Sequence, residues 1–170
     1  MKNRKETNGL EQLAAAVGKW RGTNVLQDPH TGKADKSAST AAVTPLLGGR
    51  FVRLDYTWRW GGKPQEGSLL LGFDGEAEKL RGYWIDSWHQ SARALLCEGP
   101  RPSGGQLSVR GSYPAPPGPD WGWRIAVARK PRGLKMTMFN VTPDGQEEVA
   151  VEAAWTPPAA AGSAARRRSR

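Results

Sequence analysis

Apolar and polar residues alternate with a period of two along most of the chain. The clearest case is the segment FVRLDYTWRW at 51–60, in which every second residue from Val52 to Trp60 is apolar or aromatic. Successive side chains of a β-strand point to opposite faces, so this alternation predicts a half-buried antiparallel strand. Gly48-Gly49 before the segment and Gly61-Gly62 after it are turn signals that mark its ends.

Nine further segments carry the same pattern, some of them weakly. The ten predicted strands cover residues 20–27, 36–46, 51–60, 66–73, 79–88, 91–98, 106–113, 121–128, 134–141 and 147–156. Helical spacing occurs once, where Leu10, Leu13, Ala14 and Val17 predict a short helix that Gly18 ends. Asn8 or Thr7 is the expected cap of that helix.

Ten short strands joined by turns, without crossover helices, predict an all-β antiparallel fold. Short sequential connections favour an up-and-down β-barrel of about ten strands over a Greek-key sandwich, and closure removes exposed sheet edges. A barrel of this size encloses either one small-molecule cavity or a packed interior.

Composition agrees with one turn-rich domain. The chain has 170 residues, and Gly (21) with Pro (13) makes up about a fifth of them, which disfavours a helix bundle. One cysteine excludes an intramolecular disulfide and a multi-cysteine metal site, and two histidines exclude a His-rich metal centre. Tryptophan, with eight residues, dominates the aromatic content.

The net charge is +9, and four arginines among the last five residues account for four of these charges, so the rest of the chain carries a mild excess of +5. Arg166, Arg167, Arg168 and Arg170 lie in the low-complexity segment 157–170, which is predicted to be a disordered basic tail, as residues 1–7 are predicted to be a disordered N-terminus. The barrel domain then spans 8–156. The tail is either a solubilising segment or a weak electrostatic contact for nucleic acid or an anionic surface.

The sequence predicts no membrane span, because no segment approaches the roughly 20 apolar residues that a bilayer requires. The apolar run 13–17 is shorter than the core of a secretory signal, which needs about 7–15 residues. This feature and the single thiol, Cys97, together predict a cytoplasmic location.

Several short motifs occur in a fixed order. They are LAAAVGKWRG at Leu13–Gly22, LGGRF at Leu47–Phe51, Glu66-Gly67, LGFD at Leu71–Asp74, WIDS at Trp84–Ser87 and Asp144-Gly145. Their order resembles a bacterial domain-of-unknown-function family with a lipocalin-like, or calycin-like, β-barrel, over about Leu10 to Trp155. The resemblance implies a single barrel with a helix against one end, and it implies no activity.

The resemblance also bears on cofactors. A related group of barrels binds haem through a histidine near the C-terminus, and here no histidine follows His89. No cofactor is therefore expected. The sequence also contains no nucleophile elbow, phosphate loop or metal-spaced carboxylate set.

The segment 79–88 carries the candidate site. Its parity puts Trp84, Asp86 and Trp88 on one face, and an inward Trp face would bury a carboxylate among indoles. Tyr56 and Trp58 are expected on a nearby wall. Asp86 is then either a structural carboxylate with a hydrogen-bonding partner or a group that orients a ligand or transfers protons.

The remaining candidates are interpreted as structural. His89 is expected to be a solvent-exposed turn residue, His30 a turn residue, and Cys97 an inert buried thiol. The prediction is therefore that the barrel binds a small, largely apolar molecule in its lumen and is not an enzyme. The alternatives are an enzyme that uses Asp86 as a lumenal acid or base, and weak polyanion binding through the Arg-rich tail.

Overall fold

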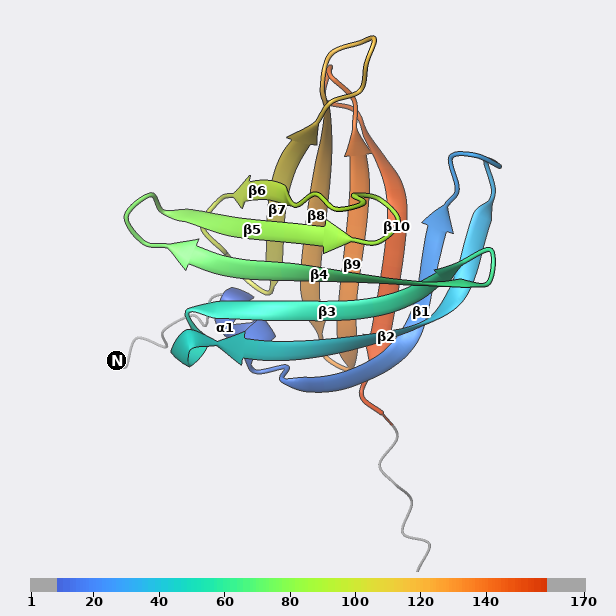
Figure 1. Cartoon of the computed structure of the whole chain (residues 1–170). Helices are drawn as coiled ribbons and strands as arrows, with labels where there is room; N and C mark the ends of the chain where they lie inside the picture. Colours follow the sequence, from blue (N-terminus) through green and yellow to red (C-terminus); the bar gives the residue numbers. More distant parts are fainter. Residues whose placement is uncertain (1–8, 159–170) are drawn as a thin grey trace, which may run out of the picture.

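The computed structural model describes residues 9–158 (Figure 1). A short helix α1 (Gly9–Ala14) precedes ten strands, and one turn of 3-10 helix (Leu47–Gly49) follows the second strand. The strands are β1 (Gly18–Gln27), β2 (Ala34–Leu46), β3 (Phe51–Trp60), β4 (Lys63–Asp74), β5 (Lys79–Asp86), β6 (Leu95–Gly99), β7 (Gln106–Tyr113), β8 (Trp121–Lys130), β9 (Gly133–Val141) and β10 (Glu147–Thr156).

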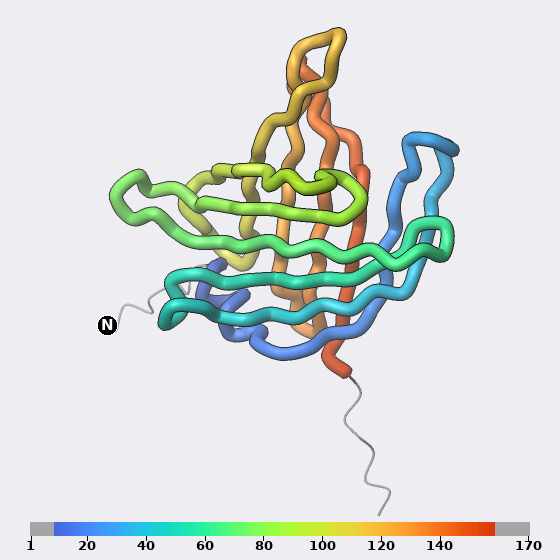
Figure 2. The backbone as a smooth tube through the Cα atoms, viewed as in Figure 1, coloured from blue at the N-terminus to red at the C-terminus, as the bar shows by residue number. Residues whose placement is uncertain are grey.

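The ten strands form one closed antiparallel barrel. Each strand pairs with the next in the chain, and β1 closes the barrel against β10, with Gly22 opposite Trp155. The backbone trace shows this meander around the barrel (Figure 2). The predicted all-β up-and-down barrel with a short N-terminal helix is therefore confirmed.

Three strands, β3, β7 and β10, begin and end at the predicted residues. Two predicted boundaries near the candidate site are wrong. β5 ends at Asp86 instead of residue 88, and β6 begins at Leu95 instead of residue 91, so that 87–94 is a connection. The helix likewise ends at Ala14, before Val17. The predicted disordered segment 1–7 and most of the predicted tail lie outside the described residues.

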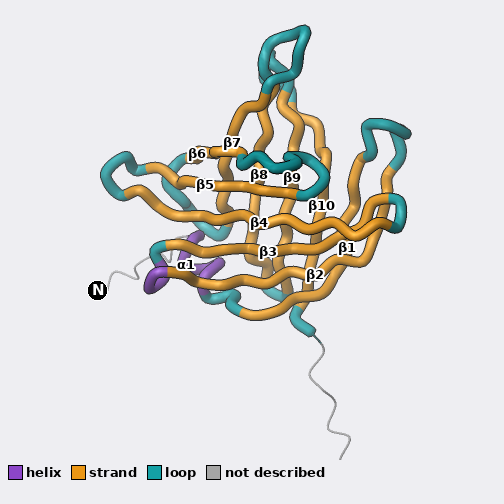
Figure 3. The backbone as a smooth tube through the Cα atoms, in the orientation of Figure 1, coloured by secondary structure: helices purple, strands orange, loops and turns teal. Residues whose placement is uncertain are grey.

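The two ends of the barrel differ. Helix α1 lies at one end, where it contacts β2, β3, β4, β7 and β8 and buries Leu10 and Leu13. Because the strands alternate in direction, the connections 28–33, 61–62, 87–94, 114–120 and 142–146 gather at the other end (Figure 3). We call this end the open end. Within residues 9–158, no helix has the length and apolar character needed to cross a membrane.

Candidate functional site

The two faces of β5 differ sharply in exposure. Trp84 and Asp86 are buried inside the barrel, whereas Tyr83 and Ile85 are 43% and 52% exposed. The inward face is therefore the one that carries the tryptophan and the carboxylate, as the parity of the sequence predicted. Tyr56 and Trp58 of β3 are also buried in the interior.

Tyr56, Trp84 and Asp86 are joined in one chain of hydrogen bonds. The Trp84 indole Nε1–H donates to Tyr56 Oη at 2.8 Å, and the Tyr56 hydroxyl donates to Asp86 Oδ2 at 2.8 Å. Gly67 lies between Tyr56 and Asp86 in the β-sheet register. A Cβ at Gly67 would lie 2.3 Å from Tyr56 Oη, so the missing side chain lets the phenol ring reach the carboxylate.

The other oxygen of Asp86 forms the turn that ends β5. Asp86 Oδ1 accepts the backbone N–H groups of Trp88 at 2.9 Å and His89 at 3.0 Å, an arrangement typical of Asx turns. These bonds explain why the strand ends two residues before the predicted boundary. Trp88 therefore follows the strand instead of belonging to it, and it is half-buried.

His89 is not the exposed turn residue that its position predicted. Its side chain is only 11% exposed, and Nδ1 lies 2.9 Å from Asp86 Oδ1. The turn at Asp86 directs the imidazole into the barrel, where its ring centroid lies 5.4 Å from that of Trp84 and 5.1 Å from that of Trp123 on β8. The sequence interpretation missed this residue because it treated the turn as solvent-facing.

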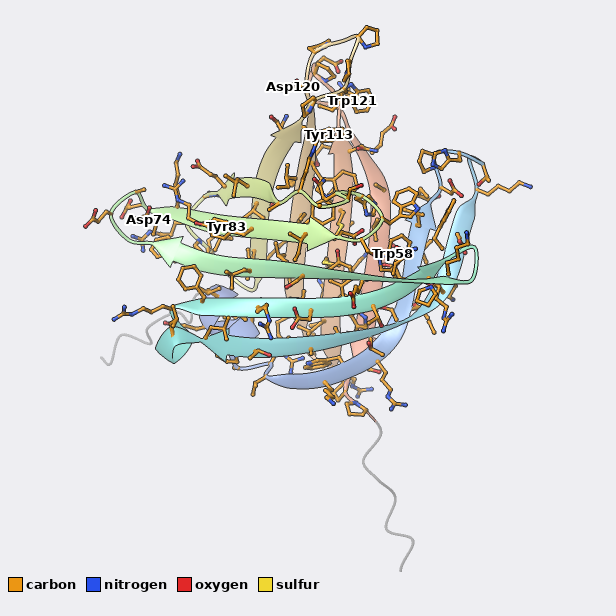
Figure 4. All side chains as sticks on the ribbon, in the orientation of Figure 1. Trp58, Asp74, Tyr83, Tyr113, Asp120 and Trp121 are labelled. Carbon is orange, nitrogen blue, oxygen red and sulfur yellow. The ribbon has the colours of Figure 1, made fainter. Side chains whose placement is uncertain are left out.

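Five indole rings, four of them packed against His89, form a cluster that we call the indole cluster. Its members are Trp58, Trp60, Trp84, Trp88 and Trp123. Trp84 and Trp123 stack nearly parallel, with centroids 5.4 Å apart and an angle of 11° between planes. Trp88 packs edge-on against His89 at 4.6 Å. Trp58 lies on the β3 side of the open end and Tyr113 on the β7 side (Figure 4).

Burial and hydrogen bonds act in opposite directions on the site's titratable groups. Burial raises the pKa of Asp86, but the hydrogen bonds that the carboxylate accepts from His89 and from the Tyr56 hydroxyl outweigh it and lower the pKa below its ordinary value. For Tyr56, burial and the neighbouring Asp86 carboxylate raise the pKa well above the ordinary value. Near neutral pH the pair is therefore an ionised carboxylate that accepts from a neutral phenol.

Three buried polar atoms have no hydrogen-bond partner among the described residues. They are His89 Nε2, Trp123 Nε1 and Asn24 Nδ2. Two of them belong to the indole cluster and its central imidazole. Polar atoms that are buried without a partner are rare in folded proteins because each loses its bonds to water. These atoms are therefore the part of the interior most suited to a ligand.

A hollow of about 780 Å³ lies on the opposite, outer face of the sheet. Outward-facing side chains of β1 to β5 line most of it, among them Lys19, Thr57 and Ser68. Two of the lining hydroxyls, Thr40 Oγ1 and Thr57 Oγ1, lie 2.6 Å apart. This hollow offers a second place for a molecule, on the polar side of the same strands.

The remaining candidates lie outside the hydrogen-bonded chain of Tyr56, Trp84, Asp86 and His89. Cys97 is buried, and burial raises the pKa of its thiol to about 12. His30 lies in the 28–33 connection, where its ring faces Trp60 and Trp88 at about 6 Å. Among residues 9–158, no three His, Cys, Asp or Glu side chains are grouped to hold a metal ion. The four predicted contact arginines, Arg166 to Arg168 and Arg170, lie outside the described residues.

Comparisons with known proteins place the chain by family and fold. A family model described as "Protein of unknown function (DUF1579)" matches residues 6–156. No curated protein matches the sequence. Among solved structures, Rv2717c from M. tuberculosis has 14% sequence identity, with a TM-score of 0.62 over 88% of this chain and 97% of that chain. At this identity the similarity shows a shared barrel fold.

Proposed function

This chain belongs to the family of proteins of unknown function DUF1579, and we propose that it binds a small, largely apolar molecule inside its barrel. The bound molecule would lie at the open end, against the indole cluster. Ligand pockets are mostly apolar and contain a few placed polar groups, and this end of the interior has that character. The family resemblance predicted from the ordered motifs is confirmed, and it carries no activity with it.

One observation carries the proposal. His89 Nε2 and Trp123 Nε1 are buried without a partner among the described residues, and their rings lie 5.1 Å apart. In a barrel core that serves packing alone, such atoms would be expected to have hydrogen-bond partners or to be replaced by apolar groups. Each buried polar group without a partner lowers the stability of the fold by about 1–3 kcal/mol. A bound molecule with polar atoms of its own could form hydrogen bonds with both groups and so restore the lost stability.

The hydrogen bonds of Asp86 favour a positioning role over acid–base chemistry. Both of its oxygens are already bonded, Oδ2 to Tyr56 and Oδ1 to Trp88 and His89. Its lowered pKa leaves it ionised near neutral pH, whereas a useful acid or base has a pKa near the working pH. The enzyme alternative based on Asp86 therefore has less support than binding.

A route to the site runs past Trp88. Trp88 is half-buried, and the connection that follows it is exposed from Ser91 to Ala94. The hydrogen bonds of Asp86 hold the first residues of the connection, at Trp88 and His89. We propose that the Trp88 ring moves aside to admit the ligand while the turn at Asp86 keeps its shape.

Fluorescence of the neutral probe N-phenylnaphthylamine tests the proposal on the full chain. Thr57 and Trp58 are neighbours on β3 that point to the outer hollow and to the interior respectively. The Thr57→Tyr variant places a phenol ring in the hollow, whereas Trp58→Leu removes an indole from the cluster. We expect the probe to bind the wild type and Thr57→Tyr equally, and Trp58→Leu at least about fivefold more weakly, since a buried aromatic contact contributes about 1 kcal/mol or more to binding.

The opposite result overturns lumenal binding. If Thr57→Tyr abolishes probe binding and Trp58→Leu leaves it unchanged, the molecule occupies the outer hollow. If the wild type does not bind the probe, the barrel interior is a packed core. Circular dichroism checks that each variant folds, and Trp58→Phe replaces Trp58→Leu in the experiment should the latter not fold.

Two predictions from the sequence remain proposals. The single thiol of Cys97 favours a reducing, cytoplasmic location. The four arginines near the C-terminus favour a weak, salt-sensitive contact with nucleic acid or an anionic surface. Removing residues 158–170 and measuring DNA binding at several salt concentrations tests the second proposal.

A further inference from the structure

The carboxylate of Asp86 fixes which nitrogen of His89 carries a proton. Asp86 Oδ1 lies 2.9 Å from His89 Nδ1 and also accepts the backbone N–H of His89. An ionised carboxylate is an acceptor only, so Nδ1 must donate the shared proton. In the neutral imidazole the lone pair is then on Nε2, which becomes a hydrogen-bond acceptor of fixed direction.

Trp123 supplies the complementary atom. Its Nε1–H is a donor without a partner among the described residues, and Nε2 of His89 has none either. The two ring centroids lie 5.1 Å apart at an angle of 51°. Two neighbouring rings in the barrel interior therefore carry an acceptor and a donor that are both without a partner among the described residues. The other cluster indole on β5, Trp84, already donates to Tyr56.

The surroundings of this pair favour a flat molecule. Trp58 and Trp88 approach each other edge to face at 5.9 Å, and both contact His89. Of Trp58 and Trp88, Trp88 is the partly exposed one, so its displacement would open a slot bounded by aromatic faces. Planar aromatic molecules pack well in such slots, because ring faces and edges attract one another.

We propose that the ligand is a flat aromatic molecule whose polar edge carries a hydroxyl or ring amide, donating to His89 Nε2 and accepting from Trp123 Nε1–H. This inference rests on the proposed function, since it names the class of molecule for the same site. Tyr56 and Asp86 act as positioning residues: Asp86 fixes the His89 imidazole, and Tyr56 bonds the second oxygen of Asp86. A site with a buried donor and acceptor discriminates strongly against analogues that lack the matching group.

Naphthol and its methyl ether test the inference by isothermal titration calorimetry. The ether keeps the rings and loses the hydroxyl proton, so only one of the two bonds can form. We expect the wild type to bind naphthol at least about tenfold more tightly than the ether. The His89→Phe variant should bind both compounds with similar affinity, because it removes the acceptor and retains a ring.

A matched pair of tryptophan variants isolates the donor. Trp123→Phe removes an indole N–H without a partner, whereas Trp155→Phe removes one that already donates to Ser39 Oγ at 2.7 Å. Trp123→Phe is expected to weaken naphthol binding by about tenfold, and Trp155→Phe to leave it unchanged.

The outcomes separate this inference from the proposed function. If the wild type binds naphthol and its ether equally well, the interior binds flat molecules but His89 and Trp123 do not select them. The inference is also overturned if the preference for naphthol persists in His89→Phe, or if Trp123→Phe binds naphthol as tightly as the wild type. If neither compound binds the wild type, the proposed function itself is overturned.

Discussion

Tyr56 and Asp86, on strands two apart in the barrel, are joined by a hydrogen bond of 2.8 Å that passes over the backbone of Gly67. The bond uses one oxygen of the carboxylate and leaves the other to form the turn that carries Trp88 and His89. One carboxylate thus links the barrel wall to the imidazole at the centre of the indole cluster.

Gly67→Ala should disrupt the link directly. The new Cβ would lie 2.3 Å from Tyr56 Oη and 2.9 Å from Asp86 Oδ2, so the phenol would have to leave its place. We expect a loss of about 1–3 kcal/mol in the free energy of unfolding, measured by urea denaturation. Gly75→Ala is the control, because nothing lies within 4 Å of its added Cβ. Equal stability of the two variants would contradict the close packing at Gly67.

Asp86→Asn should change the response to acid. The hydrogen bonds of native Asp86 lower its pKa below 3.8, so ionised Asp86 stabilises the folded state above that pH, and its contribution is lost as pH falls further. We expect Asp86→Asn to be less stable than the wild type by about 1.5–3 kcal/mol near neutral pH, with the difference shrinking in acid. Urea denaturation at stepped pH measures it. A difference that stayed constant into acid would exclude an ionised, hydrogen-bonded Asp86.

Neighbouring residues on β5 should respond very differently to truncation. Trp84 is fully buried and Ile85 is half exposed on the outer face. We expect Trp84→Ala to cost about 3–5 kcal/mol and Ile85→Ala no more than about 0.5 kcal/mol in the free energy of unfolding. Thermal denaturation of the two variants gives the comparison. Similar losses in both would mean that the two faces of β5 are assigned incorrectly.

Cys97 should be inert in the folded protein. It is buried, and burial raises its pKa to about 12, so little of the nucleophilic thiolate exists at mildly alkaline pH. A chromogenic disulfide reagent is expected to label the thiol only after denaturant is added. Rapid labelling of the native chain would show that β6, at Cys97, opens readily or is exposed.

The sequence predicted the strands well wherever one face of the barrel is polar. In β3, alternation from Val52 to Trp60 places apolar side chains inward and polar ones outward, and the observed strand has the predicted bounds. The same reasoning placed Trp84 and Asp86 inside. Parity works here because burial on one face fixes the register of a strand.

Parity did not predict that β5 ends at Asp86 or that His89 points into the barrel. The period of two continues through Trp88 in the sequence, but the side chain of Asp86 bonds the following backbone N–H groups and ends the strand. A single carboxylate-to-backbone contact therefore overrides the pattern, and it turns His89 inward. An Asp three residues before a His was the one local signal available for this turn.

Trp123 was missed for a different reason. Its inward face on β8 was visible in the sequence, but its proximity to His89 depends on the closure of the barrel, which brings the 87–94 connection against β8. The partnerless state of its indole N–H is also a property of the packed interior. Neither feature can be predicted from the residues that flank Trp123 in the sequence.

The indole N–H resonances of the eight tryptophans offer the most direct test of lumenal binding. In a nuclear magnetic resonance titration of the full chain with naphthol, we predict that the signals of Trp58, Trp88 and Trp123 shift. Those of Trp20 and Trp155, which already donate to Ala16 O and Ser39 Oγ, should stay in place. Trp20 also borders the outer hollow. Shifts confined to Trp20, or no shift at any tryptophan, would contradict binding inside the barrel.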